Sequence, residues 1–293
     1  MSTVSLPDSL AERYAKVCDR IARSAEASGR KERDIFLVAV TKNAEPDQVR
    51  AMIEMGHRDF GENRVQQLVQ RAAMVDEYLT RLRVVPSARR AAGSDQAESL
   101  FGPGGGNDRL AVAGATGKIR WHMIGHLQRN KARKVVDLVR LVHSVDSLRV
   151  AEELQAVALR RDIIVEVLLQ VNCSGEGTKF GCPVPAAVPM AEQIQSMANV
   201  RLRGLMTIAA EGASELETRR TFARCREIHD EVKALDAEGQ VNLLSMGMTG
   251  DYHLAILEGA NIVRVGTALF GESRRPEAQD EPEEPDDEPG EGE

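Results

Sequence analysis

Residues 242–267 read NLLSMGMTGDYHLAILEGANIVRVGT and contain two strand-like apolar runs, at 242–246 and 261–265. Both runs are mostly apolar rather than alternating, which is typical of parallel strands that are buried on both faces. Further back along the chain, six more strand-like runs are separated by amphipathic helical runs. They lie at 35–41, 58–61, 119–124, 141–144, 163–171 and 201–208.

This alternation of eight strands with helices predicts an α/β fold, namely a (β/α)8 TIM barrel. Helices are expected at 46–55, 147–160, 184–197 and 216–237, and the capping box Ser9-x-x-Glu12 predicts an added N-terminal helix. An open doubly wound sheet is the competing fold. It lacks support because no G-x-G-x-x-G motif opens a helix after the first strand.

The composition of the 293 residues indicates one domain and two segments that are poor in large apolar residues. We expect a barrel domain over 1–271, a flexible insertion at about 85–118 that is rich in Ala, Gly, Ser and charge, and a disordered acidic tail over 272–293. Residues 277–293 hold ten carboxylates and no basic residue, so the net charge of −7 leaves +3 for the rest of the chain.

The near-neutral body argues against nucleic-acid binding as the main function, since no Lys/Arg stripe stands out. No apolar run is long enough to cross a bilayer, and the first residues lack the pattern of a secretory signal. The four cysteines are scattered without a C-x-x-C pair, so we expect reduced thiols in a cytoplasmic protein.

The active site of a barrel lies at the carboxyl ends of its strands, where the first strand runs into Thr41-Lys42. Burial of Lys42 in the barrel mouth would lower its pKa and leave an amine able to form a Schiff base with a carbonyl. The alternative is a lysine whose stem is buried and whose ammonium reaches solvent.

The turns after the last two strands favour an anion site. Ser245 to Gly250 form a glycine-rich loop, and Arg264-Val265-Gly266-Thr267 ends the chain's last strand. Loops at these two positions of a barrel frequently bind phosphate. A phosphate site opposite Lys42 suggests pyridoxal 5′-phosphate (PLP). Arg264, a permanent donor at the pyridine nitrogen, would keep that nitrogen unprotonated and disfavour carbanion chemistry.

These residues lie in longer stretches that resemble the PLP homeostasis protein family, single-domain relatives of the alanine racemase barrel. The stretches are LVAVTKNAEPDQVRAMIEMGHRDFGENRVQQL (37–68), WHMIGHLQRNKARKVVDLVRLVHSVDS (121–147), LLQVNCSGEGTKFG (168–181), VRLRGLMTIA (200–209) and LSMGMTGDYHLAILEGANIVRVGTALFG (244–271). Together they cover nearly the whole expected barrel in order.

The resemblance implies a role for each of seven residues. Lys42 would carry the Schiff base, and Arg264 would face the pyridine nitrogen. Ser245, Gly266 and Thr267 would hold the phosphate, Asn63 of the Gly-Glu-Asn motif would border the ring, and Met246 would contact the cofactor. The family implies a cytoplasmic, non-enzymatic protein that buffers or delivers PLP and so affects amino-acid metabolism, with PLP-dependent apoenzymes as potential partners. A monomer is expected, with no nucleic-acid or membrane partner.

A PLP-dependent amino-acid racemase is the main alternative. Racemisation needs a base on each face of the substrate, and in the alanine racemase relatives the second base is a tyrosine from a separate domain. No such domain is expected here, and Tyr14, Tyr78 and Tyr252 do not fall at strand ends.

Three further classes are disfavoured. A metal hydrolase could use His122, His126 and His143, but no glutamate lies between the first two histidines and no metal is expected. A serine or cysteine nucleophile has no G-x-S-x-G motif to support it. A scaffold without a cofactor would not need the residues named above.

Overall fold

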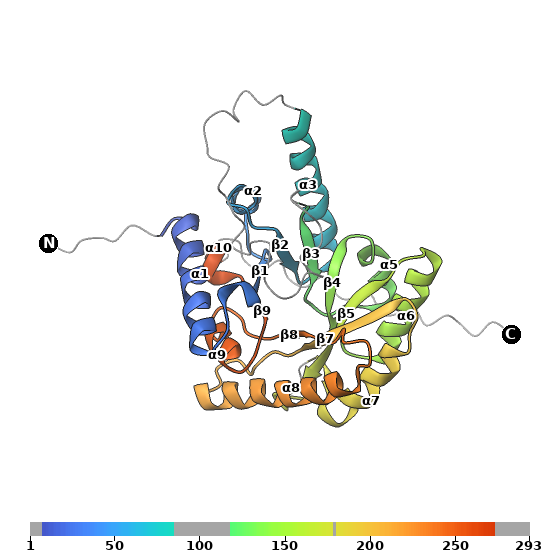
Figure 1. Cartoon of the computed structure of the whole chain (residues 1–293). Coiled ribbons are helices and arrows are strands. Elements are labelled where there is room, and N and C mark those ends of the chain that lie inside the picture. The colour runs from blue at the N-terminus through green and yellow to red at the C-terminus, as the bar shows by residue number, and fades with distance from the viewer. Residues whose placement is uncertain (1–7, 85–117, 178–179, 273–293) are drawn as a thin grey trace.

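The computed structural model describes residues 8–84, 118–177 and 180–272, and within them eight parallel strands close into a barrel (Figure 1). The strands follow one another around the barrel in chain order, and β1 pairs with β9 to close it. They are β1 (Phe36–Val40), β2 (Asp59–Glu62), β3 (Arg120–Met123), β4 (Val139–Val145), β5 (Val165–Asn172), β7 (Val200–Met206), β8 (Leu243–Ser245) and β9 (Ile262–Val265). A two-residue strand, β6 (Cys182–Pro183), pairs with the end of β5.

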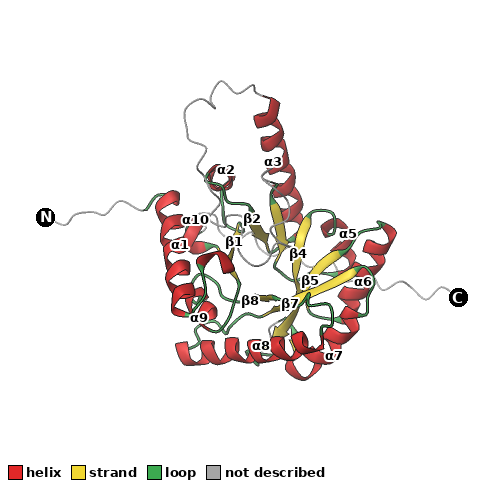
Figure 2. Ribbon diagram, in the orientation of Figure 1, coloured by secondary structure: helices red, strands yellow, loops and turns green. Residues whose placement is uncertain are grey.

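Helices surround the barrel, as Figure 2 shows. They are α1 (Leu10–Ala27), α2 (Pro46–Glu54), α3 (Val65–Val84), α5 (Ala132–Val135), α6 (Leu148–Arg160), α7 (Val184–Gln195), α8 (Glu215–Leu235), α9 (Tyr252–Leu257) and α10 (Thr267–Phe270). The Ser9 hydroxyl accepts from the Glu12 amide, and the Glu12 carboxylate accepts from the Ser9 amide, so the predicted capping box starts α1. The predicted barrel fold and its added N-terminal helix are confirmed.

The strands separate two apolar clusters. The outer cluster lies between strands and helices and contains most of the buried apolar residues. The inner cluster is small and consists of Val38, Leu141, Leu168, Met206, Leu243 and Ile262, with Phe36 and Ile208 against it. On β8 the side chains alternate, so Leu243 lies inside the barrel and Leu244 faces the helices.

A close backbone approach joins β7 to β8. Gly204 has a φ of +148°, and a Cβ there would lie 1.7 Å from the carbonyl oxygen of Leu243. Further along the same pair of strands, the Thr207 amide donates to the Ser245 carbonyl over 3.1 Å. The glycine therefore sets the spacing of two strands whose ends belong to the site described below.

The predicted insertion at about 85–118 and the acidic tail fall almost wholly outside the described residues, so the domain boundaries stay predictions. Among the described helices, none combines the length and the hydropathy that a membrane span requires.

Candidate functional site

Lys42 lies in the turn that follows β1, two residues beyond the last strand residue, Val40. Thr41 before it is buried and donates its hydroxyl to the carboxylate of Glu62 at the end of β2. The Lys42 side chain is exposed. The burial expected from the sequence is therefore not observed, because the strand ends at Val40 and the lysine lies in the turn beyond it.

Glu62 is fully buried beside this turn. Its Oε1 accepts from Arg71 Nε over 2.8 Å and from Thr41, whereas its Oε2 has no hydrogen-bond partner among the described residues. Burial raises the pKa of Glu62, although its contacts with Thr41 and Arg71 oppose the rise. A buried carboxylate oxygen without a hydrogen-bond partner among the described residues is thus held next to the Lys42 turn.

Asn63 follows Glu62 and is half-buried. The loop after β3 fixes its backbone, since a Cβ at Gly125 would lie 2.1 Å from the Asn63 carbonyl oxygen. The predicted neighbour of the ring therefore lies at the same end of the barrel as Lys42, one strand along.

Ser245 and Arg264 meet inside the barrel at the ends of β8 and β9. Arg264 Nη1 donates to Ser245 Oγ over 2.6 Å, and Arg264 Nη2 donates to the Thr207 carbonyl over 3.0 Å. Both side chains are buried, and burial lowers the pKa of Arg264 to about 10. The guanidinium therefore remains a cation at neutral pH and is aimed by two fixed acceptors.

The Met246 side chain points away from the barrel interior, unlike that of Ser245. It is fully buried in the outer cluster, together with Leu244 and Tyr252, because side chains on a strand alternate and Ser245 points inward. Its cofactor contact stays a prediction that this position does not favour.

Gly266 and Thr267 form the turn that starts α10. Gly266 lies against the end of β1, since a Cβ there would be 3.3 Å from Val40 Cβ. Thr267 is exposed, and the next amide, of Ala268, donates to Thr249 Oγ1 over 3.4 Å. Thr249 lies in the loop after β8. It is not among the site residues predicted from the sequence, although a hydroxyl in a glycine-rich loop is the signal that could have identified it.

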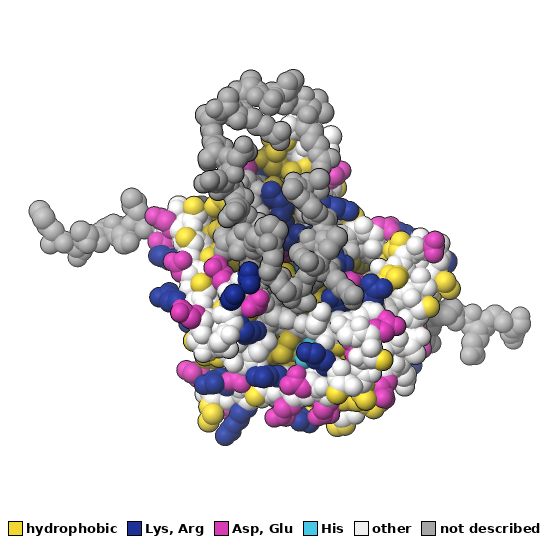
Figure 3. Space-filling model, in the orientation of Figure 1, with side chains coloured by type: hydrophobic (Ala, Val, Ile, Leu, Met, Phe, Trp, Pro, Cys, Tyr) yellow, Lys and Arg dark blue, Asp and Glu magenta, His cyan; other side chains and the backbone are white. Residues whose placement is uncertain are grey.

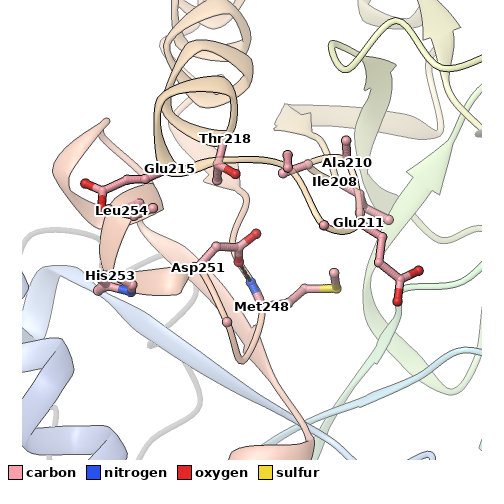
Figure 4. Close-up of a pocket in the computed structure, with 13 residues that line it drawn as sticks. Ile208, Ala210, Glu211, Glu215, Thr218, Met248, Asp251, His253 and Leu254 are labelled. Carbon is pink, nitrogen blue, oxygen red and sulfur yellow. Dashed lines mark hydrogen bonds between the residues drawn. The ribbon is translucent and has the colours of Figure 1, made fainter.

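A cavity of about 740 Å³ lies beside this loop (Figure 4). The loop after β7 forms one wall with Ile208 and Glu211, and the loop after β8 and α9 form the other with Met248, Asp251 and Leu254. Asp251 Oδ1 accepts from the Met248 amide over 2.6 Å and so fixes the second wall. None of the seven residues predicted from the sequence lines this cavity, but Met248 and Gly250 flank Thr249.

Comparisons with known proteins identify the family. The alanine racemase N-terminal domain family matches residues 20–274. The pyridoxal phosphate homeostasis protein of Pseudomonas aeruginosa is 36% identical over 262 residues, which cover 89% of this chain and 95% of that protein. That of Aquifex aeolicus is 32% identical over 90% of this chain and 98% of that protein. PipY of Synechococcus elongatus, solved with PLP bound, superposes with a TM-score of 0.68 at 30% identity over 90% of this chain and 100% of that one.

The chain belongs to the pyridoxal phosphate homeostasis protein family. This confirms the resemblance read from the sequence, and the barrel of the family is that of the alanine racemase N-terminal domain. In this family member the face shown in Figure 3 carries Lys and Arg side chains intermixed with Asp and Glu rather than a stripe of one charge.

The histidines considered for a metal site do not converge in this family member. His122 Nδ1 and His143 Nε2 are hydrogen-bonded over 2.9 Å inside the barrel, whereas His126 bonds Asp146 and stacks on Phe180 at the rim. In the described parts of the chain, no group of three or more His, Cys, Asp and Glu side chains could hold a metal ion.

Proposed function

We propose that this protein binds PLP at the carboxyl end of its barrel and acts in PLP homeostasis, by buffering or delivering the cofactor. Membership of the family and the PLP bound to PipY support the proposal. The observation that carries it is the buried Arg264 cation, which Ser245 and Thr207 hold at the ends of the last strands. A buried cation with a fixed direction suits an anionic, aromatic ligand.

The residues at this end of the barrel fit the groups of PLP. The Thr249 hydroxyl accepts from the Ala268 amide and keeps its own hydrogen, which it could donate to a phosphate. Arg264 keeps its protons and would therefore only donate to the ring nitrogen, and Asn63 follows β2 at the same end of the barrel. Ser245 contributes by holding Arg264, and its predicted phosphate contact would have to be made from a fully buried position.

Lys42 is proposed to hold the cofactor covalently. When bound, PLP supplies an aldehyde that reacts reversibly with amines. Lys42 Nζ would form a C=N bond with the aldehyde carbon, and the carbonyl oxygen would leave as water. Lys42 is an exposed residue, which suits a protein that must release its cofactor.

We further propose that the protein has no catalytic turnover of its own and is a cytoplasmic monomer. The relatives are named as homeostasis proteins rather than as enzymes. A racemase would need a second base, and the tyrosines of the described residues are engaged elsewhere. Tyr14 bonds His57, Tyr78 bonds Glu54, and Tyr252 is buried in the outer cluster. Size-exclusion chromatography with light scattering tests the monomer.

Absorbance spectra with added PLP, before and after borohydride reduction, test the binding mode. We expect a Schiff-base band that reduction converts into a stable adduct on the peptide that contains Lys42. The Lys42→Ala variant should lose the adduct, and Lys16→Ala, which removes an exposed lysine on α1, should keep it. Wild-type protein without a band, or an adduct on another lysine, would contradict the proposal.

Delivery and turnover are tested separately. PLP-loaded protein is mixed with the apo form of a PLP-dependent aminotransferase, and recovered transaminase activity reports delivery. Loaded protein incubated alone with L-amino acids is examined by chiral chromatography, where any enzyme-dependent D-isomer would favour the racemase instead.

A further inference from the structure

A continuous hydrogen-bond chain crosses the barrel interior from β2 to β9. Asp59 Oδ1 and His122 Nε2 are 3.2 Å apart, and His122 Nδ1 and His143 Nε2 are 2.9 Å apart. His143 Nδ1 lies 2.9 Å from Ser245 Oγ, which accepts from Arg264 Nη1 over 2.6 Å. We call these five residues the interior relay. Its middle members are buried, so their hydrogen bonds to one another replace water.

The two ends of the interior relay lie in different surroundings. Asp59 is the first residue of β2 and pairs with Arg120, the first residue of β3, and their side chains are 14% and 28% exposed. Arg264 lies near the end of β9, at the proposed cofactor site. Burial alone would raise the pKa of Asp59, but hydrogen bonds from His122 and Arg120 outweigh it and hold that pKa far below its usual value. Asp59 is therefore a carboxylate that only accepts.

Donor and acceptor counts fix the direction of every bond when both histidines are neutral. His122 must use its one N–H to donate to Asp59, so its Nδ1 accepts from His143 Nε2. His143 Nδ1 then has no hydrogen and must accept from the Ser245 hydroxyl. Ser245 meanwhile accepts from Arg264, so its single hydrogen points into the barrel and away from any ligand.

One added proton reverses this arrangement. With both nitrogens protonated, His122 still donates to Asp59 and now also donates to His143 Nε2. His143 Nδ1 then carries the hydrogen and donates to Ser245 Oγ. Ser245 accepts from both neighbours, and its own hydrogen is released as a donor. The change passes along buried side chains and requires no movement of the backbone.

We propose that the interior relay couples the binding of an anionic ligand at the barrel mouth to the uptake of one proton by the relay. The inference rests on the proposed function, since PLP and its phosphate esters are the anions considered. Two effects act in the same direction: the added charge attracts the anion, and the Ser245 hydroxyl becomes available to donate.

The two histidines of the interior relay have different surroundings. Burial, then the neighbouring His122 and Arg264, lower the pKa of His143 well below its usual value, so His143 stays neutral. His122 alone has a carboxylate on one side and a neutral imidazole nitrogen on the other. The charged and titratable groups that face the amino-end part of the relay are Arg120 on β3, His57 and Arg58 before β2, and Tyr14 on α1.

The test is calorimetric titration with pyridoxine 5′-phosphate, which lacks the aldehyde and so reports binding without the Lys42 linkage. Titrations in buffers of different ionisation enthalpy give the number of protons taken up, at several values between about pH 6 and 8, where histidines exchange protons. The ionisation of the ligand is identical for every variant, so differences between variants belong to the protein. Full coupling corresponds to a tenfold change in Kd per pH unit.

The wild type should take up as much as one proton more than His122→Gln, which keeps a polar side chain but cannot titrate. Ser245→Ala, which breaks the interior relay without removing a histidine, should lose the part of the uptake that depends on the Ser245 hydroxyl and serves if the first variant does not fold. His229→Gln, a buried histidine on α8 beside Asp230, is the matched control and should behave as the wild type. Equal proton counts in the wild type and both relay variants would overturn the coupling. No binding of either pyridoxine 5′-phosphate or PLP to the wild type would instead overturn the proposed function and the coupling with it.

Discussion

Replacing Gly204 with alanine should destabilise the barrel where β7 meets β8. The φ of +148° is a backbone conformation that side chains other than glycine rarely adopt, and the added Cβ would lie 1.7 Å from the Leu243 carbonyl oxygen. That oxygen belongs to the strand backbone and cannot rotate away. The strands must separate, which weakens the ladder that ends in the Thr207–Ser245 bond.

The expected loss has two sources. Backbone strain at such a residue is about 1–3 kcal/mol. Overpacking against fixed atoms adds about 1–3 kcal/mol. The sum, about 2–6 kcal/mol, is a large fraction of the roughly 5–15 kcal/mol that stabilises a typical protein. Each kcal/mol corresponds to about 2–4 °C in a domain somewhat smaller than this one, so a loss of about 4 kcal/mol lowers Tm by about 8–16 °C.

Two other glycines separate the sources. Gly212 has a φ of +72°, and an added Cβ there would have no atom within 4 Å, whereas Gly177 has neither a positive φ nor a close atom. Gly212→Ala should therefore lose only the strain, about 1–2 kcal/mol. Gly177→Ala should change stability by less than about 0.5 kcal/mol. Thermal unfolding followed by circular dichroism gives the three values.

A Gly204→Ala protein that melts less than about 2 °C below Gly212→Ala would refute this reasoning, because the contact with Leu243 would then contribute nothing beyond strain. A second consequence is functional. Since Thr207 and Ser245 hold Arg264, a folded Gly204→Ala protein should also bind PLP more weakly than Gly212→Ala does.

Three further predictions concern single side chains. Thr249→Val should weaken PLP binding about 5–10-fold, as the loss of one hydrogen bond implies, and Thr249→Ser should retain it, as measured by equilibrium ultrafiltration. The pKa of Asp59 is lower in the folded than in the unfolded state, so the stabilisation that Asp59 provides is present above its unfolded pKa of about 3.9 and is lost as pH falls. Asp59→Asn should therefore reduce the free energy of unfolding by about 2–3 kcal/mol at neutral pH and by less in acid, as measured by urea unfolding across pH. The pKa of Glu62 is higher in the folded than in the unfolded state, so its effect on stability has the opposite pH dependence. The wild type should lose stability relative to Glu62→Gln as pH rises above about 4.3, the unfolded pKa, and unfolding free energies of the two proteins that change in parallel with pH would contradict this.

The strands were predictable because parallel strands buried on both faces leave continuous apolar runs in the sequence. The run at 261–265 became β9, Ile262–Val265, and the run at 242–246 became β8, Leu243–Ser245. β6 was not predicted, because two residues cannot form a pattern and its pairing depends on where β5 ends.

Burial on both faces, which made the strands predictable, made the side-chain directions at the site harder to predict. Leu243 to Met246 are all buried, so no alternation of polarity marks which residues face the barrel interior. Only closure of the barrel decides that Ser245 points inward and Met246 outward. Lys42 differs from its expectation because the exact end of a strand decides whether the next lysine is buried, and the sequence does not fix strand ends to one residue.

The pairing of His122 with His143 illustrates a third limit. The two histidines lie 21 residues apart in the sequence, where they enter only together with His126 as candidates for a metal site that the sequence disfavours. Their contact depends on the register of β3 against β4, which shifts between Trp121 and His122. A register shift of one residue would have turned one ring to the opposite face of the sheet.

The polar interior has an energetic consequence that bears on function. The interior of a (β/α)8 barrel is usually filled by layers of branched apolar side chains, and a buried polar network is often no more stable than apolar residues of the same volume. Here the inner apolar cluster is small, and the interior relay connects the Asp59 end of the barrel to the Arg264 end. Because the strands are parallel, Asp59 opens β2 at the end of the barrel opposite to Lys42. The Asp59 side chain is 14% exposed at that face, and the proposed ligand would occupy the other. Under the proposed coupling, the cofactor site would therefore respond to pH through the core of the barrel rather than through its own mouth.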